Sequence, residues 1–134
     1  MDDIERAFRC AVEARERAHA PYSGFRVGAA VKAKGDPRVF GGCNVENASY
    51  GATICAERSA IVSLVSQLGK RELELVVVVA ESDPPAAPCG VCRQVLAEFA
   101  SGDLLVCLAT PAGIRERTTL DALLPRRFDL GARR

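Results

Sequence analysis

The segment Leu73–Ala80 places the tightest limit on how this chain can fold. It reads LELVVVVA, an almost unbroken aliphatic run rich in valine. A strand of this kind has apolar side chains on both faces, so it predicts a central strand of a sheet that is covered on both sides. A second aliphatic run, Leu104–Ala109, predicts another buried strand. The two runs favour a sheet that lies between layers of helix.

Helical and strand patterns alternate along the rest of the chain. Helical spacing of apolar residues, together with caps such as Gly69, predicts helices over residues 3–19, 55–68 and 89–99, with a last helical turn over 120–124. The predicted strands are residues 25–33, 38–44, 73–80, 104–109 and 114–118, the first two of which form a hairpin. Residues 45–54 predict a polar loop. This order predicts an α/β fold with a mixed sheet, because parallel neighbours need helical crossovers.

Length and composition are those of one domain. The 134 residues, 49% of them apolar, suffice for a single core, so we expect one domain over residues 1–134. The net charge is +1 without a basic stripe, which argues against nucleic acid and favours a small neutral substrate. No apolar run approaches the roughly 20 residues of a membrane span, and the acidic start Met1–Glu5 is unlike a secretory signal. We therefore expect a cytoplasmic protein with no membrane partner.

Two short segments carry the residues of a catalytic metal site. Cys55 opens one of them, and the other, Pro88–Gln94, contains Cys89 and Cys92. Cysteines three residues apart on the first turn of a helix can bind one metal ion together. Both segments fall where a strand passes into a helix, which is where ligands bind in open α/β sheets. Three thiolates leave the fourth position of a zinc ion open for water, so the pattern predicts catalytic zinc.

The charge of such a site must be offset. Three thiolates exceed the charge of Zn²⁺ by one, which weakens its Lewis acidity. The N-termini of the two helices, each worth about half a positive charge, lie at the cysteines. Arg58 and Arg93 lie within a turn of the ligands, and we expect both to donate hydrogen bonds to sulfur. Glu57 lies two residues after Cys55, where it can carry protons between the metal-bound water and a leaving group.

Purely structural interpretations compete with these. Glu57 can be a helix N-terminal carboxylate favoured by the macrodipole. The cysteines can hold structural zinc, although His19, the single histidine, lies at a helix end and is poorly placed as a fourth ligand. The six cysteines can also form three disulfides, against which stand the acidic start and the uneven spacing. We expect Cys10, Cys43 and Cys107 to be buried, inert thiols.

Four segments together resemble a known family. Besides the two cysteine segments, the stretches Pro21–Ala30 and Gly42–Gly51 are similar to the nucleoside-binding segments of small, zinc-dependent cytidine deaminases. The resemblance covers most of the chain. It implies a three-layer α/β/α cytidine deaminase-like fold with a mixed, mostly parallel five-stranded sheet. It also implies a homotetramer with one zinc ion per subunit, acting on nucleosides in pyrimidine salvage.

The resemblance also implies roles for single residues. In the family, the residues matching Asn44 and Glu46 bind the ribose hydroxyls, and the residue matching Phe25 packs on the pyrimidine. The residue matching Tyr50 lies near the ribose, and a C-terminal phenylalanine like Phe128 reaches the base of a neighbouring subunit. These types suit such roles, because Asn donates and accepts, Glu accepts, and a Phe ring offers an apolar face. Taken alone, a Phe is usually a core residue and an Asn-rich loop a turn.

The reaction that the resemblance implies is hydrolytic deamination of cytidine and deoxycytidine to the uracil nucleoside and ammonia. Zinc-bound hydroxide attacks C4, while Glu57 moves a proton from the water to ring N3 and one to the departing amine. Three other functions remain open. A blasticidin-type deaminase would not need the segment Asn44–Asn47, and a nucleotide deaminase would need cations where Glu46 lies. A zinc-stabilised binding module would hold zinc without turnover.

Overall fold

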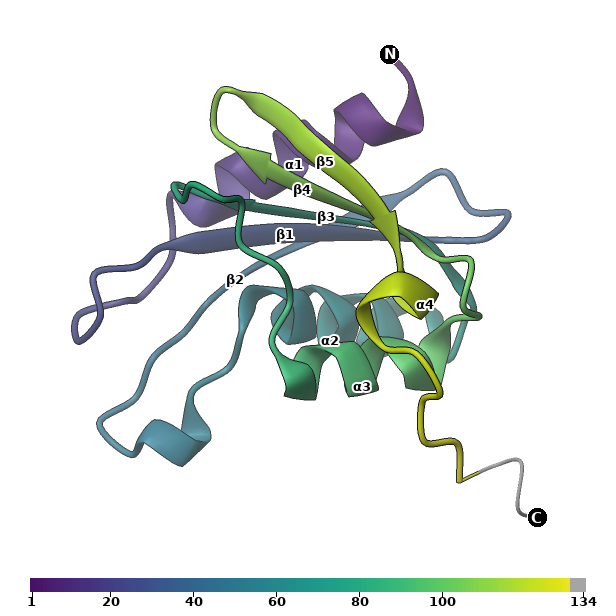
Figure 1. The fold of residues 1–134 in the computed structure, drawn as a ribbon. Helices are drawn as coiled ribbons and strands as arrows, with labels where there is room; N and C mark the ends of the chain where they lie inside the picture. Colours follow the sequence, from purple (N-terminus) through teal and green to yellow (C-terminus); the bar gives the residue numbers. More distant parts are fainter. Residues whose placement is uncertain (131–134) are drawn as a thin grey trace.

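The helices and strands of this protein form three layers. The computed structural model describes residues 1–130. Its elements are α1 (Asp3–Arg15), β1 (Val27–Ala33), β2 (Val39–Cys43), η1 (Tyr50–Ala52), α2 (Ala56–Leu68), β3 (Leu73–Ala80), α3 (Gly90–Phe99), β4 (Leu105–Thr110), β5 (Gly113–Thr119) and α4 (Leu120–Leu123). A sheet in the order β2-β1-β3-β4-β5 lies between α1 on one face and α2 with α3 on the other (Figure 1). The expected α/β fold is confirmed.

The sheet is mixed, but the expectation that it is mostly parallel is wrong. Among residues 1–130, only β3 and β4 pair in parallel, whereas the pairs β1–β2, β1–β3 and β4–β5 are antiparallel. β1 and β2 form a hairpin, and α2 connects β2 to β3. β3 pairs with β1 on the side opposite to β2. As a result, β2 and β3 run in the same direction although they are not neighbours.

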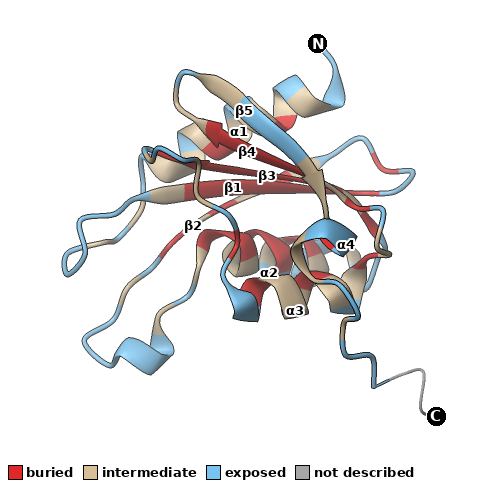
Figure 2. Ribbon diagram, in the orientation of Figure 1, coloured by how far each residue is buried: buried red, intermediate tan, exposed pale blue. Residues whose placement is uncertain are grey.

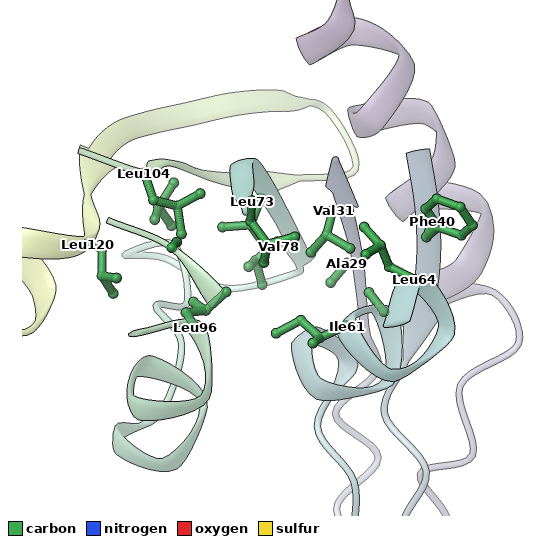
Figure 3. Packing of buried hydrophobic residues seen from close by; sticks show 14 of the residues in the cluster. Ala29, Val31, Phe40, Ile61, Leu64, Leu73, Val78, Leu96, Leu104 and Leu120 are labelled. Atoms are coloured by element: carbon green, nitrogen blue, oxygen red, sulfur yellow. The ribbon is translucent and has the colours of Figure 1, made fainter. Parts of the chain in front are cut away.

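A hydrophobic core lies on each face of the sheet. Buried residues are concentrated on the strands and on the sides of the helices that face them (Figure 2). On the α2 side, Ile61 lies close to Ala29 and Val31 (Figure 3). On the α1 side, Ala7 and Ala11 are fully buried against the other face of the strands. β3 is buried along nearly its whole length, which confirms that it is a central strand.

The first helix is shorter than the predicted one over residues 3–19. It ends at Arg15, because the chain then turns back and pairs with the segment after β2. The His19 amide donates to the Asn44 carbonyl at 3.0 Å, and the Glu46 amide donates to the His19 carbonyl at 2.8 Å. In a helix that continued to residue 19, the His19 amide would instead donate to the carbonyl of Arg15, four residues earlier. The other predicted elements agree to within about two residues, and the predicted loop also contains the short helix η1.

α2 and β2 approach each other closely at Gly42. A Cβ atom at this position would lie 2.3 Å from the amide nitrogen of Ala60 and 2.8 Å from the carbonyl oxygen of Ala56. Both are backbone atoms of α2, which cannot move aside as a side chain can. Glycine therefore lets the first turns of α2 pack directly on the strand. The contact lies in the first turns of α2, and Cys55 immediately precedes the start of that helix.

The variant Gly42→Ala is expected to lower the free energy of unfolding by roughly 1–3 kcal/mol, because the added methyl group overpacks the contact with α2. Thermal or urea unfolding followed by circular dichroism measures this change. Gly51→Ala is the matched control, since a Cβ there meets no atom within 4 Å. Equal stability of the two variants would contradict the prediction.

Candidate active site

Three connecting segments meet at one edge of the sheet. β2 and β3 both end there, because each is antiparallel to β1, and β1 starts there. The register shows this directly, since Gly28 pairs with Cys43 and Val27 pairs with Ala80. The loop before β1, the loop from β2 to α2 and the loop from β3 to α3 therefore leave from the same edge. The expected convergence of the two cysteine segments follows from this arrangement.

The three predicted zinc ligands lie together at this edge. Cys55 and Cys89 are the N-cap residues of α2 and α3, and Cys92 lies in the first turn of α3. Their Sγ atoms all lie within 4.8 Å of one another, and those of Cys55 and Cys89 are 3.9 Å apart. A tetrahedral zinc ion with bonds of about 2.3 Å needs sulfurs about 3.8 Å apart, so the donor set fits zinc. Within residues 1–130 no fourth protein ligand joins the cluster, which leaves a position for another ligand.

Positive charge reaches the sulfurs from Arg58 and from the two helix N-termini. Nη2 of Arg58 lies 3.5 Å from Sγ of Cys55 and also donates to the Thr53 carbonyl at 3.2 Å. Sγ of Cys89 accepts from the amide of Cys92 at 3.5 Å. A hydrogen bond from Cys92, helped by Arg58, lowers the pKa of Cys55 to about 5, and the same bond raises the pKa of Cys92. A dication bound at the sulfurs would displace the thiol protons.

Arg93 makes different contacts from those expected, and the prediction that it donates to sulfur is wrong. Its Nε donates to the Pro88 carbonyl at 2.7 Å, and its Nη1 donates to the Leu123 carbonyl at 2.7 Å. The planar guanidinium therefore joins the loop before Cys89 to the end of α4. Arg93 holds the backbone next to a ligand and does not act on the sulfur itself.

Glu57 is buried beside the sulfurs. Its side chain is on the first turn of α2, and only 4% of the residue is exposed. With Cys55 and Cys89 it lines a cavity of about 290 Å³, which we call the metal-side cavity. Burial raises the pKa of Glu57, and the charge of Cys55 adds to the effect. A carboxyl group with a raised pKa exchanges protons more readily near neutral pH, as acid–base catalysis requires.

Three residues predicted to bind substrate line the same metal-side cavity, namely Phe25, Asn44 and Glu46. The Asn44 side chain is held in place on both sides. Its Nδ2 donates to the Phe25 carbonyl at 2.8 Å, and its Oδ1 accepts from the Val27 amide at 2.9 Å. One amide hydrogen of Asn44 is left to offer to a ligand. The structure thus brings the predicted binding residues and the sulfurs around one space.

Tyr50 and Phe128 lie outside the metal-side cavity. Tyr50 is 74% exposed, contacts Tyr22 edge-on with ring centroids 5.9 Å apart, and lines an adjoining cavity of about 410 Å³. Phe128 is 54% exposed and lines a cavity of about 520 Å³ near the end of α3. The latter is the largest of the three, but the cysteine cluster does not line it. We place the active site by its chemistry, at the metal-side cavity.

Two polar residues at the site were not predicted from the sequence. Ser23 and Thr53 line both the metal-side cavity and the adjoining one. Thr53 offers its carbonyl to Arg58, and the hydroxyl of Ser23 bonds to Glu46. A short polar residue in a turn is a signal for local hydrogen bonding. The partners of these two residues cannot be read from the sequence, because the fold alone brings the segments together.

Comparison with known proteins agrees with this geometry. Residues 1–108 match the family model described as "Cytidine and deoxycytidylate deaminase zinc-binding region". The cytidine deaminase of Sporosarcina psychrophila is 45% identical over 126 residues, which cover 94% of this chain and 91% of that protein. The cytidine deaminase of Halalkalibacterium halodurans is 44% identical over 94% of each chain.

Solved structures show the same relationship. The crystal structure of cytidine deaminase from Burkholderia pseudomallei has a TM-score of 0.84 and 44% identity, over 92% of this chain and 98% of that one. The crystal structure of cytidine deaminase from Mycobacterium tuberculosis has a TM-score of 0.80 and 39% identity, over 97% of this chain and 100% of that one. The chain therefore belongs to the cytidine and deoxycytidylate deaminase family, and it is a deaminase of the hydrolase class.

The variant Cys89→Ser is expected to reduce zinc affinity by more than about 10-fold. Loss of a residue that only hydrogen-bonds to a metal ligand already lowers affinity by about this factor, and Cys89 is itself an expected ligand. Serine is a good N-cap residue, so α3 should still form. Competition with a chromophoric chelator measures the affinity, and circular dichroism checks the fold. Cys10→Ala is the control, because Cys10 lies on α1 and outside the cluster. Unchanged zinc affinity in Cys89→Ser would rule out this ligand set.

Proposed function

We propose that this chain catalyses the zinc-dependent hydrolytic deamination of cytidine and deoxycytidine, which yields the uracil nucleoside and ammonia. The observation that carries the proposal is the buried carboxyl group of Glu57 in the cavity that Cys55 and Cys89 also line. An acid–base group beside an open metal position suits hydrolytic attack on an amino-substituted ring carbon. Relatives that carry the name cytidine deaminase support this choice of substrate.

One zinc ion per chain is the proposed cofactor, held by Cys55, Cys89 and Cys92. When bound in such an open site, zinc supplies Lewis acidity that lowers the pKa of a water molecule. Arg58 and the N-termini of α2 and α3 offset the excess negative charge of three thiolates. The chain itself therefore provides the charge balance that keeps the metal acidic.

Glu57 is the proposed proton carrier. Its carboxylate takes a proton from the attacking water and donates it to ring N3 of cytosine. It then takes the proton of the new C4 hydroxyl group and passes it to the departing amine as the C4 carbonyl forms. The new C4–O bond replaces the C4–N bond, and ammonia leaves. The raised pKa of Glu57 supports both directions of transfer, and its burial limits exchange with bulk water. Backbone groups near Cys55 and Cys89 are proposed to hold the edge of the base.

The residues on the sugar side favour a nucleoside over a nucleotide. The ring of Phe25 is proposed to pack on the pyrimidine, and Asn44 and Glu46 to bind the ribose hydroxyls. Among the described residues, the linings of the metal-side cavity and the adjoining one contain no Lys or Arg. A phosphate group would instead meet the carboxylate of Glu46, which repels it.

The assay that tests this function uses purified, zinc-loaded protein with cytidine, deoxycytidine, cytidine monophosphate and blasticidin S. Ultraviolet absorbance follows loss of the amino group, and a coupled assay follows ammonia. We expect turnover of the two nucleosides and none, or far slower turnover, of the other two compounds. Stoichiometric zinc without turnover of any of them would overturn the proposal in favour of a binding module.

The variant Glu57→Gln is expected to keep zinc bound while kcat falls by at least about 100-fold, the lower range for loss of a general acid–base group. Metal analysis and steady-state kinetics on cytidine measure the two effects. Glu98→Gln is the matched control, because Glu98 is an exposed carboxylate on α3 outside the metal-side cavity. Near-normal turnover in Glu57→Gln would show that another group carries the protons.

Residues 1–134 are further proposed to act as one domain in a cytoplasmic homotetramer of pyrimidine salvage. Tyr22, Tyr50 and Phe128 are each more than half exposed, and exposed aromatic rings are typical of association surfaces. In this assembly Phe128 would reach the base in a neighbouring site, and Tyr50 would lie near the ribose. Among residues 1–130, no helix combines the length and apolar character needed to cross a membrane.

Light scattering on the purified protein is expected to give four times the chain mass of 14.3 kDa. Phe128→Ala should weaken turnover of cytidine, because the base would lose an apolar face, and dilution should lower activity together with tetramer content. A monomer with full activity would contradict both the assembly and this role of Phe128.

A further inference from the structure

The hydroxyl group of Ser23 joins two residues proposed to bind opposite ends of the substrate. It donates a hydrogen bond to Oε2 of Glu46, and it accepts one from the amide of Phe25 at 2.9 Å. Ser23 also lines both the metal-side cavity and the adjoining one. A single exposed hydroxyl thus lies between the carboxylate proposed for the sugar and the backbone of the residue proposed for the base.

The count of donors and acceptors leaves little freedom in this network. A serine hydroxyl has one hydrogen, which goes to Glu46, while one lone pair takes the Phe25 amide. Oε1 of Glu46 accepts from the amides of Tyr22 and Ser23, at 3.0 and 3.1 Å. Its other oxygen, Oε2, has Ser23 as its donor and keeps acceptor capacity for one ligand hydroxyl. The Ser23 hydroxyl is also the main cause of the lowered pKa of Glu46, which keeps this carboxylate an acceptor.

The backbone of Phe25 is held from both sides by the same group of residues. Ser23 takes its amide, and Asn44 donates to its carbonyl at 2.8 Å. The position of the Phe25 backbone and the orientation of the Glu46 carboxylate are therefore linked through one hydroxyl. If that hydroxyl is removed, Oε1 of Glu46 still holds the turn through two amides. The turn should survive, but Oε2 then loses the donor that fixes its direction.

We propose that Ser23 is a positioning residue for nucleoside binding: its hydroxyl aims Oε2 of Glu46 at a sugar hydroxyl and sets the distance between that contact and the base-side Phe25. This inference rests on the proposed function, and it assigns substrate selectivity to a residue that touches neither the metal ligands nor Glu57. It makes Ser23 a determinant of KM and of discrimination between sugars, and leaves kcat to the metal-side residues.

The test compares Ser23→Ala with Ser23→Thr, which keeps the hydroxyl, and with Ser66→Ala, which removes an exposed hydroxyl on α2 far from the site. Zinc-loaded proteins are assayed with cytidine, 2′-deoxycytidine and 3′-deoxycytidine. An analogue that is turned over slowly is measured as a competitive inhibitor of cytidine deamination. Zinc content and thermal unfolding are measured for every variant.

We expect Ser23→Ala to raise KM for cytidine by about 10-fold, the range for a hydrogen bond to a charged group, with kcat changed by less than about 2-fold. The increase in KM should be smaller for at least one of the two deoxy compounds. That compound lacks the sugar hydroxyl that Glu46 binds, so the wild-type protein cannot make this contact either. Ser23→Thr should recover most of the loss, and Ser66→Ala should behave as wild type.

Three outcomes would overturn the inference. One is an unchanged KM in Ser23→Ala. The second is an equal loss on all three substrates, which is the mark of a general structural defect. The third is a loss confined to kcat. Failure of the proposed function itself would be seen in the wild-type protein, which would then deaminate neither cytidine nor deoxycytidine. That result would contradict both proposals.

Discussion

The position of β1 between β2 and β3 is the constraint on which the rest of the structure depends. Because both neighbours are antiparallel to β1, they run in the same direction and end at one edge of the sheet, where β1 begins. Cys55 follows the first of these ends, Cys89 follows the second, and Phe25 precedes the start of β1. With β1 between them, the start of β1 also lies between the ends of β2 and β3, so the loop that carries Phe25 lies beside both cysteine segments. The active site is therefore a result of strand order, with the parallel pair β3–β4 having no part in joining the two cysteine segments.

Charge balance explains why two of the three proposed metal ligands, Cys55 and Cys89, occupy helix caps. Three thiolates close together repel one another unless positive charge lies nearby. Two helix N-termini supply that charge without placing a basic side chain in the metal-side cavity. Arg58 adds a full charge at 3.5 Å from the Cys55 sulfur. Its guanidinium lies on the protein side of the cluster, bonded also to the Thr53 carbonyl, and does not line the cavity. The cavity thus keeps an acidic lining, Glu46 and Glu57, which disfavours an anionic ligand.

The cysteine cluster and the nearby carboxyl group could be predicted because residue type and spacing indicate them. Cys89 and Cys92 are three residues apart, and Glu57 lies two after Cys55, so local geometry places the members of each pair near each other. Strand order then brings the two pairs together. The contacts of Arg93 could not be predicted in this way. Like Arg58, it lies within a helical turn of a ligand, but its donors reach the carbonyls of Pro88 and Leu123, and the second of these lies thirty residues away. The end of α1 was missed for the same reason, since His19 pairs with a strand extension that local periodicity does not reveal.

The sequence by itself determined the elements, the donor set for zinc and the family. These follow from periodicity, from cysteine spacing and from short segments whose residue types carry their own chemistry. Only the tertiary structure decided which strands of the sheet pair in parallel and which antiparallel, the contact of α2 with β2 at Gly42, and the network of Ser23, Glu46 and Phe25. The physical reason is the separation along the chain of the residues that interact. Hydrogen bonds and close contacts between segments that are distant in the chain depend on which strands become neighbours, and local periodicity does not encode that choice.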